Sequence, residues 1–490
     1  MRNLHRSLFY SALDKYVSIT LVIATTAIAA RLLTPDEIGI FAIASIVAVV
    51  SESLRDFGAG VYIIQSSLLT RTKLRTAFTV TAAMSVLITL ALVGISGPIA
   101  SFYTDPRLAP AVLVSAAGVL AASFASPSLA LLRREMRFRV LALINISGLL
   151  ANLLAFLALY ALGWNYLSPV LAALVASLIT TTFAVLVVHK FWMFVPCVKD
   201  WRDIVTFGGF ASATAILNTL YVSLPQLLLG RLSGLDAVGI YNRATLLCQL
   251  PDRLIVGAFQ PVIFPAFAAQ ARAGDDLKAA YLKALSLLSA VQWPALLVLA
   301  VLAEPAVRIV FGPQWDACAP VLRIMAVAWL IMTPSSLTYP ILVASGRIRD
   351  TMVSSLIVLP ASAVVVVVVA PYGMEALAWS MFATLPFQMA VAFWFIRRQI
   401  DLTWTELVKS TWQSGVVAGF AAVPPLIFVA MRGASPDLSI ATLSALFAAV
   451  AFGWLVGLAV TGHQLLGQLR VILRHSRAIV ASSPALEPTP

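Results

Sequence analysis

A few charged and polar side chains lie within or at the edges of long apolar stretches of this chain. Six of them are candidates for a binding site: Arg31, Arg55, Arg243, Arg253, Asn218 and Gln249. A charged side chain at the centre of a membrane helix costs about 2.5–3.5 kcal/mol unless it faces a cavity or a partner. Function is therefore to be sought at these positions, and their side chains suit binding rather than catalysis.

Structural roles are the competing interpretation for several of these residues. Arg31 and its counterpart Arg231 stand at the outer ends of two expected helices, where each could extend to the headgroups or tie to a nearby aspartate, Asp36 or Asp236. Arg55 follows Glu52 and precedes Asp56, so local pairing is an alternative for it.

The remaining candidates lie farther along the chain. Arg243 is about one and a half turns into its apolar stretch, and we expect it to face a cavity. For Asp252 and Arg253, a pair with charges across the helix bundle is favoured over contact with a substrate. For Asn218 and Gln249, hydrogen bonds between helices are the alternative.

Enzyme signatures are missing. The chain has no HExxH, GxxxxGK[ST] or GxSxG motif and no pair of carboxylates facing one loop, so we expect no catalytic residue and no cofactor. The three cysteines form no CxxC pair and the four histidines lie at the ends of apolar stretches or in tails, which makes a metal site improbable. Without a phosphate-binding loop the chain cannot hydrolyse ATP itself.

The composition is that of a polytopic membrane protein. Hydrophobic residues make up 61% of the chain and charged residues only 11%, whereas soluble domains carry about 25% charged residues. The net charge of +12 falls in short clusters between apolar stretches. This pattern favours loop charges that orient helices over a nucleic-acid surface.

Apolar stretches of about 20 residues predict an all-α protein with fourteen membrane helices. The first six are expected at 12–33, 38–54, 76–99, 110–132, 140–162 and 167–188. Six more are expected at 204–229, 237–267, 281–303, 320–344, 351–370 and 373–396, and two are appended at 411–431 and 439–461.

Loop charges support this count. Lys and Arg concentrate in every second loop, which predicts that both termini lie in the cytoplasm. The longest non-cytoplasmic loop, 304–319, contains Phe311-Gly-Pro-Gln-Trp315 and could form a small re-entrant turn.

An internal repeat organises the two halves. Arg31-Leu-Leu-Thr-Pro-Asp36-Glu-Ile-Gly39-Ile40-Phe41 returns as Arg231-Leu-Ser-Gly-Leu-Asp236-Ala-Val-Gly239-Ile240-Tyr241, each copy between two apolar stretches. We therefore expect two parallel six-helix lobes around a central cavity. The expected division is an N-lobe at 1–196, a C-lobe at 197–400, two helices at 401–465 and a partly disordered cytoplasmic tail at 466–490.

Prolines mark the helices expected to bend. Pro225, Pro251 and Pro334 interrupt expected spans and are our candidates for hinges or gates, with static kinks as the alternative.

These features together resemble the Wzx-type polysaccharide repeat-unit flippases of the multidrug/oligosaccharidyl-lipid/polysaccharide exporter superfamily, in the branch of colanic acid and succinoglycan exporters. The motifs that carry the resemblance are the segment 30 to 41, Asp56-Phe-Gly-Ala-Gly-Val-Tyr-Ile-Ile-Gln65, Leu228-Leu-Gly-Arg-Leu232, Val238-Gly-Ile-Tyr-Asn-Arg-Ala244 and Phe264-Pro-Ala-Phe267.

The resemblance implies translocation of an undecaprenyl-diphosphate-linked oligosaccharide to the periplasmic leaflet of a bacterial inner membrane, by alternating access. It also implies that Arg31, Arg55 and Arg243 engage the diphosphate, and guanidinium groups suit such a compact polyanion. Expected partners are the lipid-linked glycan, the bilayer and polysaccharide polymerase or export machinery. Alternatives are a cation-coupled drug exporter of the same superfamily, which calls for intramembrane carboxylates, and a membrane-embedded polymerase or glycosyltransferase, which calls for a large loop.

Overall fold

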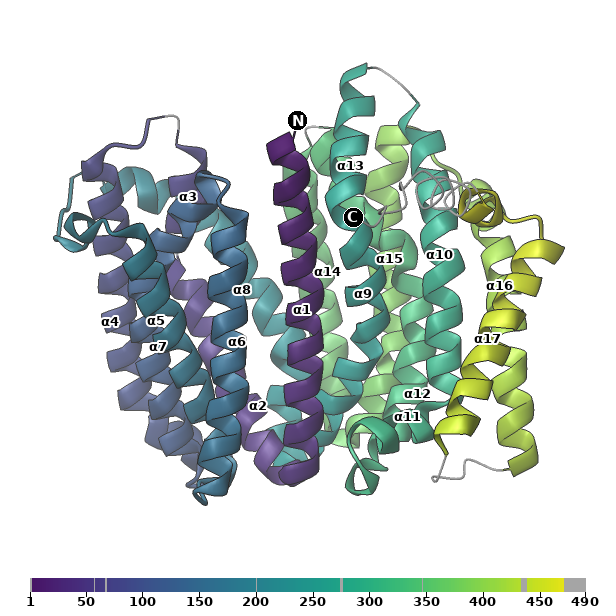
Figure 1. Cartoon of the computed structure of the whole chain (residues 1–490), viewed down its shortest axis with the longest axis horizontal. Helices are drawn as coiled ribbons and strands as arrows, with labels where there is room; N and C mark the ends of the chain where they lie inside the picture. The colour runs from purple at the N-terminus through teal and green to yellow at the C-terminus, as the bar shows by residue number, and fades with distance from the viewer. Residues whose placement is uncertain are drawn as a thin grey trace, which may run out of the picture. The chain divides into compact units, whose positions relative to one another are not determined.

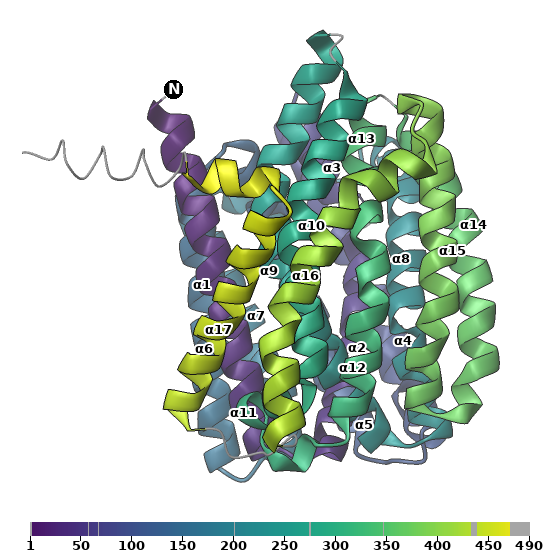
Figure 2. The ribbon, with the colours of Figure 1, turned by 90° about the vertical axis from the view of Figure 1, so that its right-hand side faces the viewer.

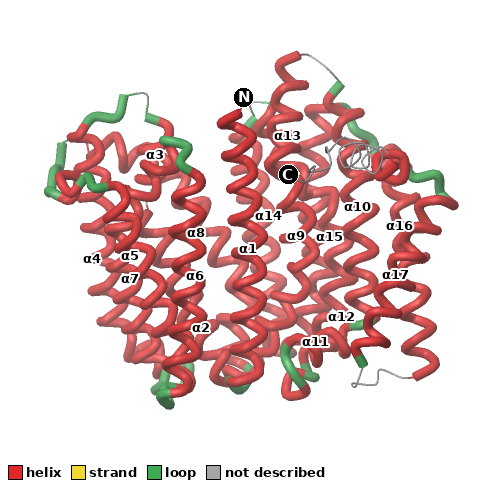
Figure 3. Tube along the Cα trace, in the orientation of Figure 1, coloured by secondary structure: helices red, strands yellow, loops and turns green. Residues whose placement is uncertain are grey.

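The computed structural model describes residues 2–56, 58–66, 68–199, 201–273, 276–345, 347–432 and 439–470. Within these ranges the chain consists of helices and loops and contains no strand (Figure 3). The all-α prediction is thus confirmed. Most of the expected tail, from residue 471 on, lies outside the described residues.

Twelve helical segments in the described part are long and apolar enough to cross a membrane. They coincide with twelve of the fourteen expected spans, usually within a few residues. The other two expected spans, 204–229 and 237–267, coincide with the helices Trp201–Leu232 and Leu235–Ala273. The total of fourteen stays a prediction.

The chain divides into two compact units. The first comprises Met1–Arg243, Val310–Ala317 and Leu359–Leu377. Its helices are α1 (Arg2–Leu32), α2 (Pro35–Asp56), α3 (Ala59–Gln65), α4 (Arg71–Phe102), α5 (Leu108–Arg134), α6 (Phe138–Ala161), α7 (Ser168–Val188), α8 (Trp201–Leu232) and the start of α9 (Leu235–Ala273). Here α5 packs against α2, α4 and α7, while α6 packs against α1 and α7 (Figure 1).

The two copies of the internal repeat meet inside the first unit. A Cβ atom added to Gly39 on α2 would lie 1.9 Å from the carbonyl oxygen of Leu235, and one added to Gly239 on α9 would lie 2.0 Å from that of Pro35. Leu235 occupies in the second copy the position of Pro35 in the first, so the contact is reciprocal. Only residues without a Cβ allow two backbones to approach so closely.

The second unit comprises Ala244–Ile309, Cys318–Val358 and Ala378–Pro490. Its helices are the rest of α9, α10 (Leu277–Val301), α11 (Ala303–Val310), α12 (Cys318–Trp329), α13 (Thr338–Ala344), part of α14 (Ile348–Val369), most of α15 (Met374–Ile400), α16 (Trp404–Arg432) and α17 (Ile440–Val460). In this unit α16 packs against α10 and α17 (Figure 2). The expected lobe boundary at residue 196 stays a prediction, and α8 groups with the first unit.

Pro334 breaks the expected helix 320–344. The α-helix ends at Trp329, a 3-10 segment covers Leu330–Leu337, and α13 follows. Because proline has no N–H, the carbonyl of Leu330 lacks its helical donor. The indole Nε1 of Trp293 on α10 donates to that carbonyl at 3.1 Å. The span expected at 320–344 is therefore present but interrupted at Pro334, whereas α8 and α9 run on through Pro225 and Pro251. The hinge role of these prolines stays a prediction.

The last two helices are fastened by small residues and a buried histidine. Cβ atoms added to Gly453 and Gly457 on α17 would lie 2.5 Å from the carbonyl oxygen of Phe420 and 2.9 Å from Cα of Val417, so this GxxxG pair allows close packing on α16. His463, 1% exposed, accepts a hydrogen bond at Nδ1 from the backbone N–H of Leu465 at 3.1 Å.

The hydrogen bond at Nδ1 places the proton of a neutral His463 on Nε2. From there it can donate to the hydroxyl oxygen of Ser286 on α10 (3.1 Å) or Ser414 on α16 (3.3 Å). Burial lowers the pKa of His463. The neutral ring thus joins α10, α16 and the end of α17.

The reciprocal glycine contact predicts a large effect of one methyl group. We expect Gly39→Ala and Gly239→Ala each to lower the thermal unfolding temperature of the detergent-solubilised protein by at least about 3 °C, since the helices must separate. Gly97→Ala is the matched control, because a Cβ there has nothing within 4 Å. Equal unfolding temperatures for all three variants would contradict the contact.

His463 predicts a dependence of stability on pH. Because its folded pKa is lowered below the unfolded value of about 6.5, only the unfolded state takes up a proton as the pH first falls below that value. Stability is therefore full above about pH 6.5 and decreases below it. We expect the thermal unfolding temperature of His463→Gln to depend less on pH than that of the wild type, measured between about pH 7.5 and 5. An unchanged pH profile in that variant would rule out His463 as the cause.

Candidate functional site

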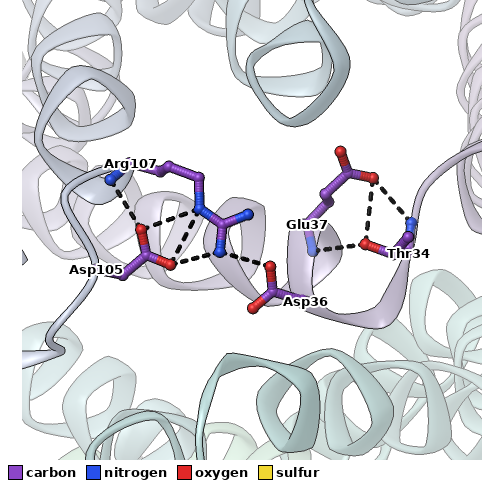
Figure 4. A network of polar contacts seen from close by, with 5 residues as sticks. All are labelled: Thr34, Asp36, Glu37, Asp105 and Arg107. Atoms are coloured by element: carbon purple, nitrogen blue, oxygen red, sulfur yellow. Dashed lines mark hydrogen bonds and ion pairs between the residues drawn. The ribbon is translucent and has the colours of Figure 1, made fainter.

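The corner between α1 and α2 in the first unit is held by a charge network around Arg107, which precedes α5. Its guanidinium Nη2 lies 2.6 Å from Oδ2 of Asp36 and 2.6 Å from Oδ2 of Asp105, and its Nε donates to both oxygens of Asp105 (Figure 4). Side-chain hydrogen bonds from Arg107 are the main reason that the pKa of Asp105 is lowered. Asp36 is thus paired with Arg107, whereas the sequence suggested Arg31.

Asp36 also lies in the first turn of α2, which Thr34 and Glu37 cap. The backbone N–H of Thr34 donates to Oε2 of Glu37 at 2.9 Å, and the backbone N–H of Glu37 donates to the Thr34 hydroxyl at 3.3 Å (Figure 4). With Pro35 at the first helical position this is a capping box. The corner that carries the repeat is therefore rigid and structural.

Arg243 is placed against an aromatic pair. It is only 4% exposed, and its guanidinium carbon lies 5.7 Å from the ring centres of both Phe311 and Trp315. The indole Nε1 of Trp315 donates to the carbonyl of Ala30 on α1 at 2.7 Å. The segment 311–315, expected as a small re-entrant turn, contains a 3-10 turn at Pro313–Trp315 and packs on the end of α1.

Arg31 meets the same segment but is exposed. A Cβ added to Gly312 would lie 4.0 Å from its Cγ. The structure therefore brings Arg31 and Arg243 to one short stretch of chain. Arg231, the repeat counterpart of Arg31, is also exposed and lies over the ring of Phe102 at 5.5 Å.

Arg55 is a buried cation near the end of α2. It is 9% exposed, and its Nη1 donates to the carbonyl of Val119 on α5 at 3.4 Å. Its Nε has no hydrogen-bond partner, and among the described residues no carboxylate lies within ion-pair distance of it. Asp56 accepts a hydrogen bond from Ser126 at 3.2 Å, so the local pairing considered for Arg55 and Asp56 is not formed.

The first unit contains a cavity of about 100 Å³, and Arg55 is connected to it through its hydrogen-bond partner Val119. Its walls come from α2, α5 and α7, and Val119, which accepts the Arg55 hydrogen bond, is one of the lining residues. Glu52, one turn before Arg55, also lines it. Sequence reasoning treated Glu52 only as an end-of-helix charge and missed the cavity.

The remaining candidates divide between the two units. Asn218 lies on an exposed face of α8, in the first unit with Pro225. In the second unit Arg253 donates to Oε1 of Gln249 at 3.0 Å, one turn earlier on α9. The pair with a charge across the bundle that was favoured for Arg253 is not among the ion pairs of the described residues.

Asp252 has an amide partner on the neighbouring helix. The side chain of Gln292 on α10 donates to its Oδ1 at 3.2 Å.

Within the described residues no group of three or more His, Cys, Asp or Glu side chains could hold a metal ion.

The comparisons with known proteins now bear on this arrangement. The model of a family described as polysaccharide biosynthesis protein matches residues 28–320, which is more than half of the chain. The chain belongs to this family. The sequence resemblance predicted a protein of polysaccharide biosynthesis, and the family match confirms this prediction.

Several relatives of this chain are named for the biosynthesis or transport of polysaccharides. The chain is 24% identical over 343 residues to the lipopolysaccharide biosynthesis protein WzxC of Escherichia coli, covering 69% of each. It is 27% identical over 305 residues to the teichuronic acid biosynthesis protein TuaB of Bacillus subtilis, covering 61% of this chain and 62% of that one. It is 26% identical to the succinoglycan biosynthesis transport protein ExoT of Rhizobium meliloti over 70% of this chain and 69% of that one.

Solved structures show the fold of this polysaccharide biosynthesis family member. The lipid II flippase MurJ in an inward closed conformation superposes with a TM-score of 0.78 at 11% identity, covering 93% of this chain and 99% of that one. An inward-facing multidrug transporter of the MATE family superposes with a TM-score of 0.55 at 16% identity, covering 80% and 94%. The chain is thus a multi-pass membrane protein with a MurJ-like and MATE-like fold.

The aromatic setting of Arg243 predicts a structural cost for its removal. We expect Arg243→Ala to lower thermal stability in detergent by about 1–2 kcal/mol or more, since two aromatic rings lose their cation and a buried space opens. Arg231→Ala is the control, because that arginine is exposed over a single ring. If Arg243→Ala unfolds at the wild-type temperature, the aromatic contacts carry no stability.

Proposed function

We propose that this protein is a flippase that moves undecaprenyl-diphosphate-linked oligosaccharide repeat units from the cytoplasmic to the periplasmic leaflet of a bacterial inner membrane. The glycan would then enter exopolysaccharide or O-antigen synthesis. Membership of the polysaccharide biosynthesis family and the names of the relatives support the substrate class. The MurJ-like fold supports a transport path through the helix bundle.

The observation that carries the proposal is the state of Arg55. A guanidinium buried in a membrane helix has lost most of its hydration, which normally requires a partner of opposite charge. The described protein residues supply one carbonyl and leave Nε unbonded. A diphosphate would supply both the charge and a bidentate acceptor, and Arg is well suited to such charge-assisted hydrogen bonds.

Other parts of the proposal rest on the sequence. Arg31, Arg243 and Arg253, with Asn218 and Gln249, belong to the proposed set of substrate contacts. The loop charges favour fourteen helices with both termini in the cytoplasm. Transport by alternating access would use the helices with Pro225, Pro251 and Pro334 as bending elements. Polymerase or export machinery would accept the product, and this chain would catalyse no reaction.

Variants of Arg55 test the proposal in cells whose own copy of the gene is deleted. We expect Arg55→Ala to reduce surface polysaccharide by about 100-fold and Arg55→Lys to restore only part of it, because lysine keeps the charge but not the fork of donors. Membrane abundance of each variant must match the wild type. Arg137→Gln is the control, since that arginine is 44% exposed in a loop.

Wild-type polymer from Arg55→Ala at normal abundance would contradict the role of Arg55 in substrate binding.

A further inference from the structure

The cavity between α2, α5 and α7 has a polar lining that packing alone does not require. Its wall includes the carboxylate of Glu52, the hydroxyls of Ser45, Ser115 and Ser177, and the ring of Phe41. Gly118 is part of the lining, and a Cβ there would meet only one side-chain atom, at 4.0 Å. The space is therefore open and lined by apolar side chains together with these polar ones, and Glu52 is exposed.

The lining offers hydrogen-bond acceptors. The hydroxyl of Ser115 donates to the carbonyl of Ala111 at 3.0 Å, and the hydroxyl of Ser177 donates to that of Gly118 at 3.4 Å. Each serine has thus used its proton on a helix carbonyl and keeps its oxygen lone pairs. A carboxylate adds only acceptors. A ligand that fits this wall must bring several donors.

Two lining residues, Glu52 and Val119, connect the cavity to Arg55, the cation that we assign to the diphosphate. Glu52 precedes Arg55 by three residues on α2, so the two side chains project from adjacent positions of one helix face. Arg55 donates to the carbonyl of Val119, which is part of the cavity wall. In a lipid-linked glycan the first sugar is bonded directly to the diphosphate, so a sugar there would lie next to Arg55.

We propose that this cavity is the subsite for the sugar attached to the diphosphate, and that it selects an uncharged sugar. The hydroxyl and amide N–H groups of a hexose or N-acetylhexosamine donate to Glu52 and the serine oxygens, and Phe41 packs on the apolar face of the ring. A uronic acid in this position is rejected, because its carboxylate would face Glu52. This inference rests on the proposed function.

Two variants test the subsite by different means. Glu52→Gln removes the charge and replaces one acceptor oxygen by an amide NH2 donor. Gly118→Leu places a bulky side chain at a lining position of the cavity. The purified full-length protein is reconstituted in liposomes, and translocation is measured for undecaprenyl diphosphate linked to N-acetylglucosamine, linked to glucuronic acid, and without a sugar.

We expect the wild type to translocate the N-acetylglucosamine lipid faster than the other two. In both variants the translocation rate of the N-acetylglucosamine lipid, divided by that of the sugar-free lipid, should fall by about tenfold. Glu52→Gln loses a charged hydrogen bond to the sugar, and Gly118→Leu removes the space that the sugar occupies. Glu52→Gln should also reduce the difference in translocation rate between the lipid with N-acetylglucosamine and the lipid with glucuronic acid. Controls are Gly94→Leu, where a Cβ has nothing within 4 Å, and Glu135→Gln, at an exposed loop residue.

The outcomes separate the two proposals. Unchanged ratios in both variants would overturn the subsite while leaving the flippase intact. A change only in the sodium or pH dependence of transport, with unchanged ratios, would also overturn it and make Glu52 a cation site. If the wild type translocates none of the three lipids, the proposed function itself fails.

Discussion

The close backbone contact between the two copies of the repeat is the constraint on which the first unit depends. Gly39 faces the carbonyl of Leu235, and Gly239 faces the carbonyl of Pro35, so each copy supplies the glycine that the other needs. Around this contact the Thr34 capping box and the Arg107 network fix the start of α2. Trp315 and Arg243 then fill the space beside α1. These contacts fix the start of α2, and the ligand contacts that we propose lie toward its other end, at Glu52 and Arg55.

The distribution of buried charge explains why binding is assigned there. Near the start of α2, Arg107 has two aspartates as neighbours, Arg243 two aromatic rings and Arg231 one ring. Arg55 is buried with one carbonyl and no carboxylate among the described residues. The energy of a membrane helix is lowered when such a charge meets an anion. Arg55, buried and without a carboxylate partner among the described residues, is therefore the arginine that we propose as the main contact of the diphosphate.

The length of the apolar stretches predicted the positions of the helices well, because a membrane imposes this length on each segment separately. The orientation predicted from loop charge stays a prediction. The two parallel lobes predicted from the repeat stay a prediction, whereas the direct contact between its two copies is seen only in the structure. Contacts between distant segments could not be predicted: Trp315 and Ala30 are 285 residues apart, and Arg107 lies 71 residues from Asp36. Neither residue type nor local spacing states which neighbour a folded helix will meet. The cavity beside Arg55 was missed for the same reason, since it depends on where Gly118 and three serines from separate helices come together.

The central claim is that lipid-linked glycan fails to cross the membrane without this protein. The most direct measurement uses cells depleted of this protein. It determines whether their undecaprenyl-diphosphate-linked units are complete and on which side of the membrane they lie, in sealed inverted and right-side-out membrane vesicles. The account predicts that complete repeat units accumulate and are reached by an added glycosidase only from the cytoplasmic side. Incomplete units, or complete units reached equally from both sides, would contradict it.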